Sequence, residues 1–372
     1  MTLATALVSG NDPLPQLAEQ AVQQALATAG LTHANGVLLF LTPEFVRHAQ
    51  AAVTTAARTA QCMQVAGGVA AGVFTESGWV LDRPAVAAMV FGNGLSLGHA
   101  DTGDAPLLSY VDDAFPPAWE GSRQRFGGSW SGSSNHGEAA VWQQSRVAVP
   151  PQCTVRILGA RLAIGVSSGL RLLGDAQRVE QSNGFDVERI GGQSASKSLE
   201  RALPAELRWH AAQHLHQLTA VLIDGNGRRK TAPRDAHYRP VAIIAVNADH
   251  SLTLAEHVAP GHYLTWAMRQ PAAAEADMRQ TVARLTEREP SPLGALMFSC
   301  IGRGPFFYAG EDRDLIVLRE RFPGLPIVGT YGTGQIAPAD RLTRIGNRLL
   351  QNAVVTALIT PLTETADVQS LP

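Results

Sequence analysis

The chain has 372 residues, of which 45% are hydrophobic and 17% are charged. This length exceeds the size at which a single hydrophobic core usually stops growing, so we expect two lobes. The formal net charge of −2 creates no long-range positive field, which argues against nucleic acid and anionic membrane surfaces as partners.

Cysteine usage and the N-terminal segment indicate the compartment. The three cysteines, Cys62, Cys153 and Cys300, form no close pair, which argues against a disulfide framework and for a reducing environment. Residues 1–13 lack the basic and apolar segments of a signal peptide, and no run of about 18 apolar residues suggests a transmembrane helix. We therefore expect a cytoplasmic protein.

The first hundred residues alternate between apolar strands and helices. Apolar residues recur at helical spacing from Leu14 to Ala29, and Gly30 follows where a left-handed cap is expected. Thr42-Pro43-Glu44 predicts the start of a second helix, with its proline in the first turn and a carboxylate near the positive end of the dipole. Strands are expected over residues 4–8, 37–41, 64–69 and 85–91.

The middle of the chain is rich in glycine, proline and serine. Residues 106–138 therefore predict a long connection, after which β-branched residues indicate strands over 139–166. In the second half, helices are expected over 197–207 and 271–287 and around Leu318. Strands are expected over 218–223, 241–246, 263–268, 295–299, 326–331 and 352–360.

Two segments of the first half align with two of the second. VLLFLTPEF lies over ALMFSCIGR, and VAGGVAAGVF lies over IVGTYGTGQI, which pairs Phe40 with Phe298, Gly67 with Gly329 and Gly72 with Gly334. Such glycines suit turns or close backbone approach, although chance similarity between apolar glycine-rich segments is the alternative. A true repeat predicts an α/β fold of two related lobes, each with helices on a mixed sheet, and a pseudo-two-fold axis. A ligand cleft is then expected between equivalent strand ends.

These segments resemble the FIST family of sensory domains. ALMFSCIGRG and RFPGLPIVGTYGTGQIAP are similar to its C-terminal signature, while GVLLFLTPEF, VAGGVAAGVFTESG and FGGSW resemble its N-terminal module. The resemblance reaches from about residue 37 to 338. It implies a FIST N-terminal domain over residues 1–220 and a FIST C-terminal domain over 221–372.

The resemblance further implies an intracellular sensor for signal transduction that binds a small polar metabolite such as an amino acid. At the last glycine turn the family usually has a glutamate, whereas this chain has Gln335, so a cation-binding role is not transferred to that position. We expect the signal to pass to a separate signalling protein.

The predicted ligand site lies over the turns at residues 299–304 and 330–335. Arg303 offers a fork for a carboxylate, and Gln335 offers both a donor and an acceptor, which together suit an amino acid. The alternative for Arg303 is a structural ion pair, for instance with Glu44. The complete set of candidate ligand contacts is Arg303, Cys300, Thr330, Thr333, Gly334, Gln335, Thr42 and Glu44.

Several motifs suggest catalysis or metal binding, and the sequence favours each of them less than ligand binding. Cys300 is a candidate nucleophile, but neither glycine-rich turn contains a histidine to act as its base, so we predict no enzyme. Residues 165–169 match the nucleophile elbow without a following helix. His210, His214 and His216 suggest a metal site or, more simply, a solvated helix face. GTYGTG is not a dinucleotide fingerprint, so no cofactor is expected; a ligand-free scaffold remains the other alternative.

Overall fold

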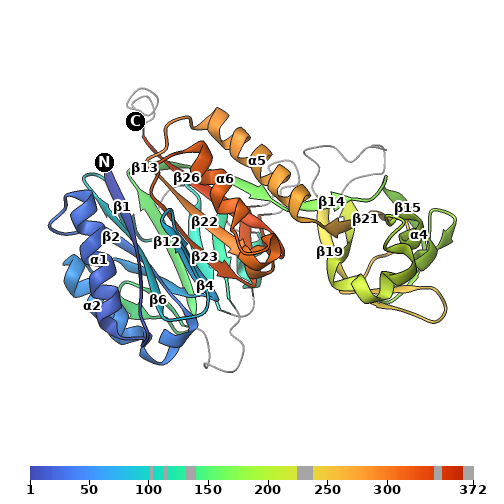
Figure 1. The fold of residues 1–372 in the computed structure, drawn as a ribbon, viewed down its shortest axis with the longest axis horizontal. Coiled ribbons are helices and arrows are strands. Elements are labelled where there is room, and N and C mark those ends of the chain that lie inside the picture. Colours follow the sequence, from blue (N-terminus) through green and yellow to red (C-terminus); the bar gives the residue numbers. More distant parts are fainter. Residues whose placement is uncertain are drawn as a thin grey trace. The chain divides into compact units, whose positions relative to one another are not determined.

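The computed structural model describes residues 1–100, 104–112, 115–121, 123–130, 140–223, 238–338 and 346–362. The chain divides into two compact units, Met1–Ser168 with Met278–Pro372, and Gly169–Asp277 (Figure 1). The second unit is thus an insertion in the chain of the first. The division expected at residue 220 falls inside a strand of the second unit and does not coincide with a boundary between the units.

The first sheet of the larger unit belongs to the N-terminal half and is covered by two helices on its outer face (Figure 1). Its elements are β1 (Thr2–Ser9), α1 (Pro15–Ala29), β2 (Gly36–Leu41), α2 (Ala49–Ala60), β3 (Val65–Val69), β6 (Ala85–Gly92), β10 (Val141–Gln143) and β11 (Arg146–Val147). The strand order is β1-β6-β2-β3-β10-β11, and β2 and β3 are parallel. All six residues of β2 are buried because both faces of the sheet are covered. The predicted strands and the cap at Gly30 are confirmed.

The second sheet draws most of its strands from the C-terminal half. Its elements are β4 (Gly72–Thr75), β5 (Gly78–Val80), β13 (Ala160–Ser167), α5 (Pro271–Arg288), β22 (Gly294–Cys300), α6 (Arg313–Arg321), β23 (Ile327–Gly332) and β26 (Val354–Pro361). The strand order is β13-β26-β22-β23-β4-β5. Apolar residues of α5 from Met278 onward and of α6 pack on the outer face of this sheet. The helices and strands expected here from periodicity are confirmed.

The ladders of the two sheets correspond strand for strand. β13-β26-β22-β23 has the same order and the same directions as β1-β6-β2-β3. Gly67 lies opposite Leu39 in the parallel pair of the first sheet, and Gly329 lies opposite Met297 in that of the second. Gly67 and Gly329 therefore hold equal ladder positions, whereas the other aligned pair, Gly72 and Gly334, begins strands of different sheets, β4 and β24 (Gly334–Pro338). Superposition of residues 37–91 on 295–359 remains a prediction.

A third sheet corrects the expectation of a long connection over residues 106–138. Its elements are β7 (Ser96–Gly98), β8 (Leu107–Val111), α3 (Pro117–Glu120), β9 (Arg125–Ser129), β12 (Gln152–Leu158), β24 (Gly334–Pro338) and β25 (Asn347–Leu350). The strand order is β25-β24-β9-β8-β12-β7. Both β8 and β9 lie within residues 106–138. β9 was missed because its sequence, RFGGS, has almost no side-chain pattern, yet all five residues are buried. Residues 113, 114, 122 and 131–138 of the expected connection lie outside the described part.

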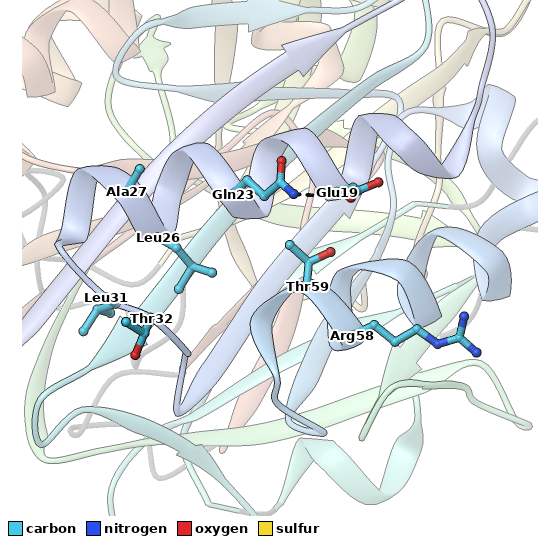
Figure 2. A pocket seen from close by; sticks show the side chains of 8 residues that line it. All are labelled: Glu19, Gln23, Leu26, Ala27, Leu31, Thr32, Arg58 and Thr59. Atoms are coloured by element: carbon cyan, nitrogen blue, oxygen red, sulfur yellow. Dashed lines mark hydrogen bonds between the residues drawn. The ribbon is translucent and has the colours of Figure 1, made fainter.

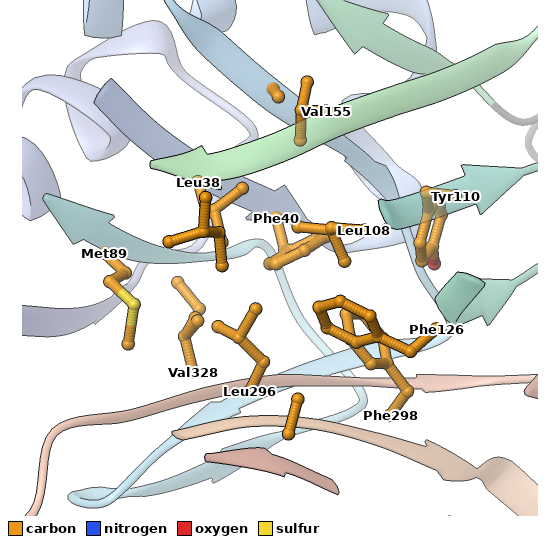
Figure 3. Packing of buried hydrophobic residues seen from close by; sticks show 14 of the residues in the cluster. Leu38, Phe40, Met89, Leu108, Tyr110, Phe126, Val155, Leu296, Phe298 and Val328 are labelled. Atoms are coloured by element: carbon orange, nitrogen blue, oxygen red, sulfur yellow. The ribbon is translucent and has the colours of Figure 1, made fainter. Parts of the chain in front are cut away.

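The three sheets of the larger unit share one apolar core. Phe40 of β2 meets Phe298 of β22 edge-on with ring centroids 6.0 Å apart, and Tyr110 of β8 lies 5.7 Å from Phe40 and 6.4 Å from Phe298. Figure 3 shows these side chains pointing toward one another from opposing strands. The two aligned phenylalanines therefore meet in the middle of the core.

The smaller unit is a closed antiparallel barrel, which the sequence did not predict. Its elements are β14 (Leu170–Leu172), β15 (Gln177–Asn183), β16 (Asp186–Ile190), β17 (Gln193–Ser194), α4 (Ala195–Ala202), β18 (Leu218–Ile223), β19 (Tyr238–Val246), β20 (Leu252–Leu254) and β21 (Tyr263–Arg269). Pairing runs β21-β15-β16-β20-β19-β18, and β18 returns to β21. A separate core that includes Val179, Leu222 and Trp266 fills it.

Within the described residues of the chain, we find no helix with the length and apolarity needed to cross a membrane.

Candidate functional site

The carboxyl ends of β22 and β23 lie side by side, as the sequence predicted. In the parallel ladder Ser299 faces Tyr331 and Cys300 faces Gly332. The turns at 299–304 and 330–335 therefore adjoin at one edge of the second sheet. Such edges are where α/β proteins usually bind ligands.

Arg303 is the most heavily bonded side chain at this edge, and it is only 1% exposed. Its Nε and Nη2 atoms each donate to Asp314 of α6 at 2.8 Å, which makes a two-point ion pair. Nη1 donates to the Ser167 carbonyl at 2.9 Å and Nη2 donates to the Ser167 hydroxyl at 2.8 Å. The Tyr308 hydroxyl also donates to Asp314, at 3.0 Å.

Arg303 therefore has the structural ion pair that the sequence left open, but with a different partner from the one suggested. Glu44 is not that partner; its Oε2 atom is buried and has no hydrogen bond within the described residues. Glu44 lies in a 3-10 helix, Pro43–His48, that precedes α2, so the helix expected from Thr42 begins in a tighter form. Burial opposes the charge on Arg303, but Asp314 and Tyr308 raise the pKa of Arg303 above its ordinary value.

A second buried carboxylate, Asp312, lies beside this ion pair. Its Oδ1 atom accepts from the Leu315 backbone N–H at 2.9 Å and so caps α6, while its Oδ2 atom accepts from the Tyr331 hydroxyl. Burial, and secondarily the charge of Asp314, raises the pKa of Asp312 to about 6. Asp312 thus joins the helix cap to the end of β23.

We expect this carboxylate to make stability depend on pH. The folded-state pKa of about 6 lies above the ordinary value of 3.8, so the contribution of Asp312 is fully present below pH 3.8. It is lost as pH rises toward 6, by an amount on the order of 3 kcal/mol. Asp312→Asn keeps an oxygen for the cap and should remove this loss. Denaturant unfolding of both proteins at pH 4.5, 5.5 and 7 measures the pH dependence of the free energy of unfolding. Equal pH profiles for the two proteins would contradict the raised pKa of Asp312.

The other predicted contacts have structural partners or lie at the margin of the site. The Thr42 hydroxyl accepts from the Ala85 backbone N–H at 2.9 Å. Thr333 donates its backbone N–H to Ser129 at 2.9 Å, and Gly334 opens β24 opposite the same serine. Cys300 is 6% exposed, and its recorded side-chain neighbour among the described residues is Asn352, at 3.9 Å between Sγ and Oδ1.

Two further sequence motifs differ in the structure from the forms that suggested them. Ser167 ends β13, and the strand β14 follows it where a nucleophile elbow needs a helix. His214 and His216 lie in a 3-10 helix, Arg208–Gln217, with ring centroids 6.3 Å apart. In a 3-10 helix residues four apart do not share a face, so the pattern that suggested a metal pair is not realised. The side chain of His210 lies outside the described part.

Three predicted contacts have buried side-chain atoms without a hydrogen bond among the described residues: Oε2 of Glu44, Oγ1 of Thr330 and both polar atoms of Gln335. The Gln335 side chain is fully buried, and neither Nε2 nor Oε1 has a hydrogen bond within the part of the chain that the structure describes. An unsatisfied buried polar group costs about 1–3 kcal/mol, so native proteins seldom keep a carboxamide in this state. The sequence selected Gln335 as a candidate contact but gave no sign that it is enclosed.

Pairing shows where the Gln335 side chain points. Gln335 lies opposite Gly128 of β9, and paired residues of antiparallel strands share a face. A Cβ on Gly128 would stand 2.9 Å from the Tyr110 ring and 3.0 Å from the Phe298 ring. Gln335 therefore faces the main core on the side of these rings, which occupy the position that a side chain on Gly128 would take. Thr330 approaches the Tyr110 hydroxyl, which itself donates to the Val69 carbonyl at 3.1 Å.

The candidate site is thus a small polar group inside an apolar core: Gln335, Thr330 and Tyr110. Burial raises the pKa of Tyr110, so its hydroxyl stays neutral and can both donate and accept. The sequence missed Tyr110 because it lies in the expected connection. Its apolar strand neighbours Leu107 and Leu108 were the available signal.

Two surface cavities lie away from this group. One, of about 560 Å³, lies along α1 and α2 and is lined by Glu19, Gln23, Leu26, Ala27, Leu31, Thr32, Arg58 and Thr59. Figure 2 shows Gln23 donating to Glu19 along α1, while Arg58 belongs to the other helix. The other has about 490 Å³ and lies between the β10–β11 hairpin and β12. None of the predicted contacts lines either cavity.

Comparison with known proteins gives the family context. Residues 195–338 match the FIST C domain. The chain is 26% identical over 215 residues to the uncharacterized proteins Mb0898c of Mycobacterium bovis and MT0897 of Mycobacterium tuberculosis, which is 57% of this chain and 55% of each relative. It is 24% identical over 220 residues to the uncharacterized protein Rv0628c of M. tuberculosis. The chain spans about half the length of these curated relatives.

Proposed function

Because residues 195–338 of this chain form a FIST C domain, a domain of sensory and signalling proteins, we propose that the protein is a signal-transduction sensor that binds a small polar metabolite. The proposal includes a FIST N domain upstream and a separate signalling protein as the recipient of the signal. It gives Cys300 no catalytic role.

The observation that carries this proposal is the enclosed, unsatisfied carboxamide of Gln335. A ligand that offers one donor and one acceptor would satisfy both of its polar atoms. The Tyr110 and Phe298 rings pack closely over the glycine opposite, Gly128, and Tyr110 and Thr330 add hydroxyl groups on the same side. A buried polar group within apolar walls is the usual composition of a small-molecule site.

The class of ligand follows from the side-chain groups that can still bind one. The Arg303 fork is bonded to Asp314 and Ser167, so it does not supply the carboxylate contact that the sequence suggested. Contacts with neutral donors and acceptors favour a ligand with an amide, and we propose an amino acid with a carboxamide side chain. Asparagine and glutamine are the first compounds to test.

We propose that the corresponding ladders of the first two sheets carry the effect of ligand binding to the signal. We propose that the two halves of the larger unit are related by a pseudo-two-fold axis through the Phe40–Phe298 contact. The corresponding strand order of the first two sheets supports this. A ligand beside Phe298 and Tyr110 touches the core that both sheets share, so its binding favours one arrangement of the sheets over another.

We expect Gln335→Leu to abolish ligand-dependent stabilisation without lowering the melting temperature of the free protein. The substitution removes two unsatisfied polar atoms and keeps a similar volume. A thermal-shift screen of amino acids on both proteins measures it. A ligand at 100 times its dissociation constant adds about 2.7 kcal/mol to the wild-type protein.

Thr356→Val is the matched control. The Thr356 hydroxyl is also buried without a hydrogen bond among the described residues. Residues two apart on a strand share a face, and Val354 and Leu358 pack against the helices. Thr356 therefore lies on the helix-covered face of the second sheet, away from the core that contains Phe298. This variant should keep the full ligand shift. A ligand shift that survives in Gln335→Leu, or that no amino acid produces in the wild-type protein, would overturn the site.

A further inference from the structure

A second cavity of the larger unit has the chemistry of an anion site. It measures about 490 Å³ and is lined by Gln64, Gly98, His99, Ala100, Gln143, Gln144, Arg146, Val147, Ala148, Val149, Pro150, Gln152, Thr154 and Val155. The lining includes one arginine, one histidine and four glutamines, and it includes no carboxylate. Its volume lies within the range of cavities that hold small molecules.

The charged group of this cavity is the guanidinium of Arg146. Within the residues that the structure describes, Arg146 makes no ion pair. Arg146 belongs to the short hairpin β10–β11, whose turn residues Gln144 and Ser145 both have positive φ, 52° and 62°. The tight turn therefore carries Arg146 and Gln144 together at the cavity wall.

Hydrogen bonds hold two of the glutamine side chains near Arg146. The Gln144 carboxamide nitrogen lies 2.7 Å from His99 Nε2, which joins the hairpin to the residue after β7. Gln143 accepts from the Thr154 backbone N–H at 3.1 Å, so its oxygen is held and its amide N–H groups are left for a ligand. The wall thus combines the Arg146 guanidinium with two carboxamides, those of Gln143 and Gln144, that hydrogen bonds hold in place.

We propose that this cavity binds a small phosphorylated polyol, such as a sugar phosphate. The Arg146 guanidinium matches a phosphate through paired N–H donors, and His99 can add a further donor. The carboxamides of Gln64, Gln143 and Gln152 each offer donors and an acceptor, which is what neighbouring hydroxyl groups require. This site is separate from Gln335 and does not depend on the proposed amino-acid site.

Calorimetric titration with glucose 6-phosphate, glucose and inorganic phosphate tests the proposal on the full chain. We expect glucose 6-phosphate to bind at micromolar to millimolar concentration and more tightly than either fragment. Arg146→Gln should weaken glucose 6-phosphate binding by about 10- to 150-fold, the range for a hydrogen bond to a charged group. Gln335→Leu should leave this affinity unchanged.

Arg58→Gln is the matched control, since Arg58 is also exposed but lies on α2 and lines the other cavity. It should bind glucose 6-phosphate as the wild-type protein does. Equal weakening by Arg58→Gln would indicate non-specific attraction to surface charge and overturn the site. Absence of glucose 6-phosphate binding at millimolar concentration, or inorganic phosphate binding as tightly, would also overturn it.

Discussion

Arg303→Ala should destabilise the folded protein by about 3–5 kcal/mol, because it leaves Asp314 as an uncompensated buried charge. The two side chains are 1% and 0% exposed, so water cannot replace the lost partner. The Ser167 carbonyl and hydroxyl would lose their donors as well. Denaturant-induced unfolding at pH 7, followed by circular dichroism, measures the change in the free energy of unfolding.

Two further variants separate burial of charge from loss of contact. The double variant Arg303→Met with Asp314→Leu should recover most of the stability, since apolar residues of similar size often replace a buried pair without loss. Arg279→Ala breaks the exposed pair with Glu320, whose side chains are 48% and 53% exposed, and should cost no more than about 1 kcal/mol. A loss below about 1 kcal/mol in Arg303→Ala would contradict the buried pair.

Gly67→Ala and Gly329→Ala should each cost more than about 4 kcal/mol or prevent folding, because the new methyl group meets backbone. A Cβ on Gly67 would stand 1.9 Å from the Leu39 carbonyl oxygen, and φ there is +151°. A Cβ on Gly329 would stand 2.3 Å from the Met297 carbonyl oxygen and 2.2 Å from the Phe74 ring. Yield of soluble protein and denaturant unfolding measure the effect.

Gly121→Ala serves as the control for the glycine pair. Gly121 follows α3 with φ of −93°, and a Cβ there meets nothing within 4 Å. Its free energy of unfolding should change by no more than about 0.5 kcal/mol. Wild-type stability in either Gly67→Ala or Gly329→Ala would show that the carbonyl contact described at that ladder position is wrong.

Local pattern in the sequence was sufficient for most elements of the larger unit. The spacing of apolar residues placed α1, α5 and α6, and Gly30 takes the left-handed conformation that its position indicated. One aligned glycine pair, Gly67 and Gly329, lies at equal positions of the two parallel ladders. These features succeed because periodicity and turn preference are properties of neighbouring residues.

The candidate site was predictable only in part. Gln335 was selected from its glycine turn, but its burial opposite Gly128, some two hundred residues earlier in the chain, follows from strand pairing. The sequence gave no sign that the Arg303 guanidinium is already hydrogen-bonded. Its partners Asp314 and Ser167 come into contact with it only in the folded chain. Tyr110 was overlooked because a glycine-rich stretch was interpreted as a connection.

The sequence by itself determined the α/β character of the larger unit, its principal helices and strands, and the adjoining turns after β22 and β23. Only the tertiary structure decided that Arg303 is an internal ion-pair partner, that β8 and β9 join a third sheet, and that residues 169–277 contain a closed barrel. Each of these depends on pairing between segments distant in the chain. Such pairing is set by which surfaces can be buried together, and the periodicity of a single segment does not contain that information.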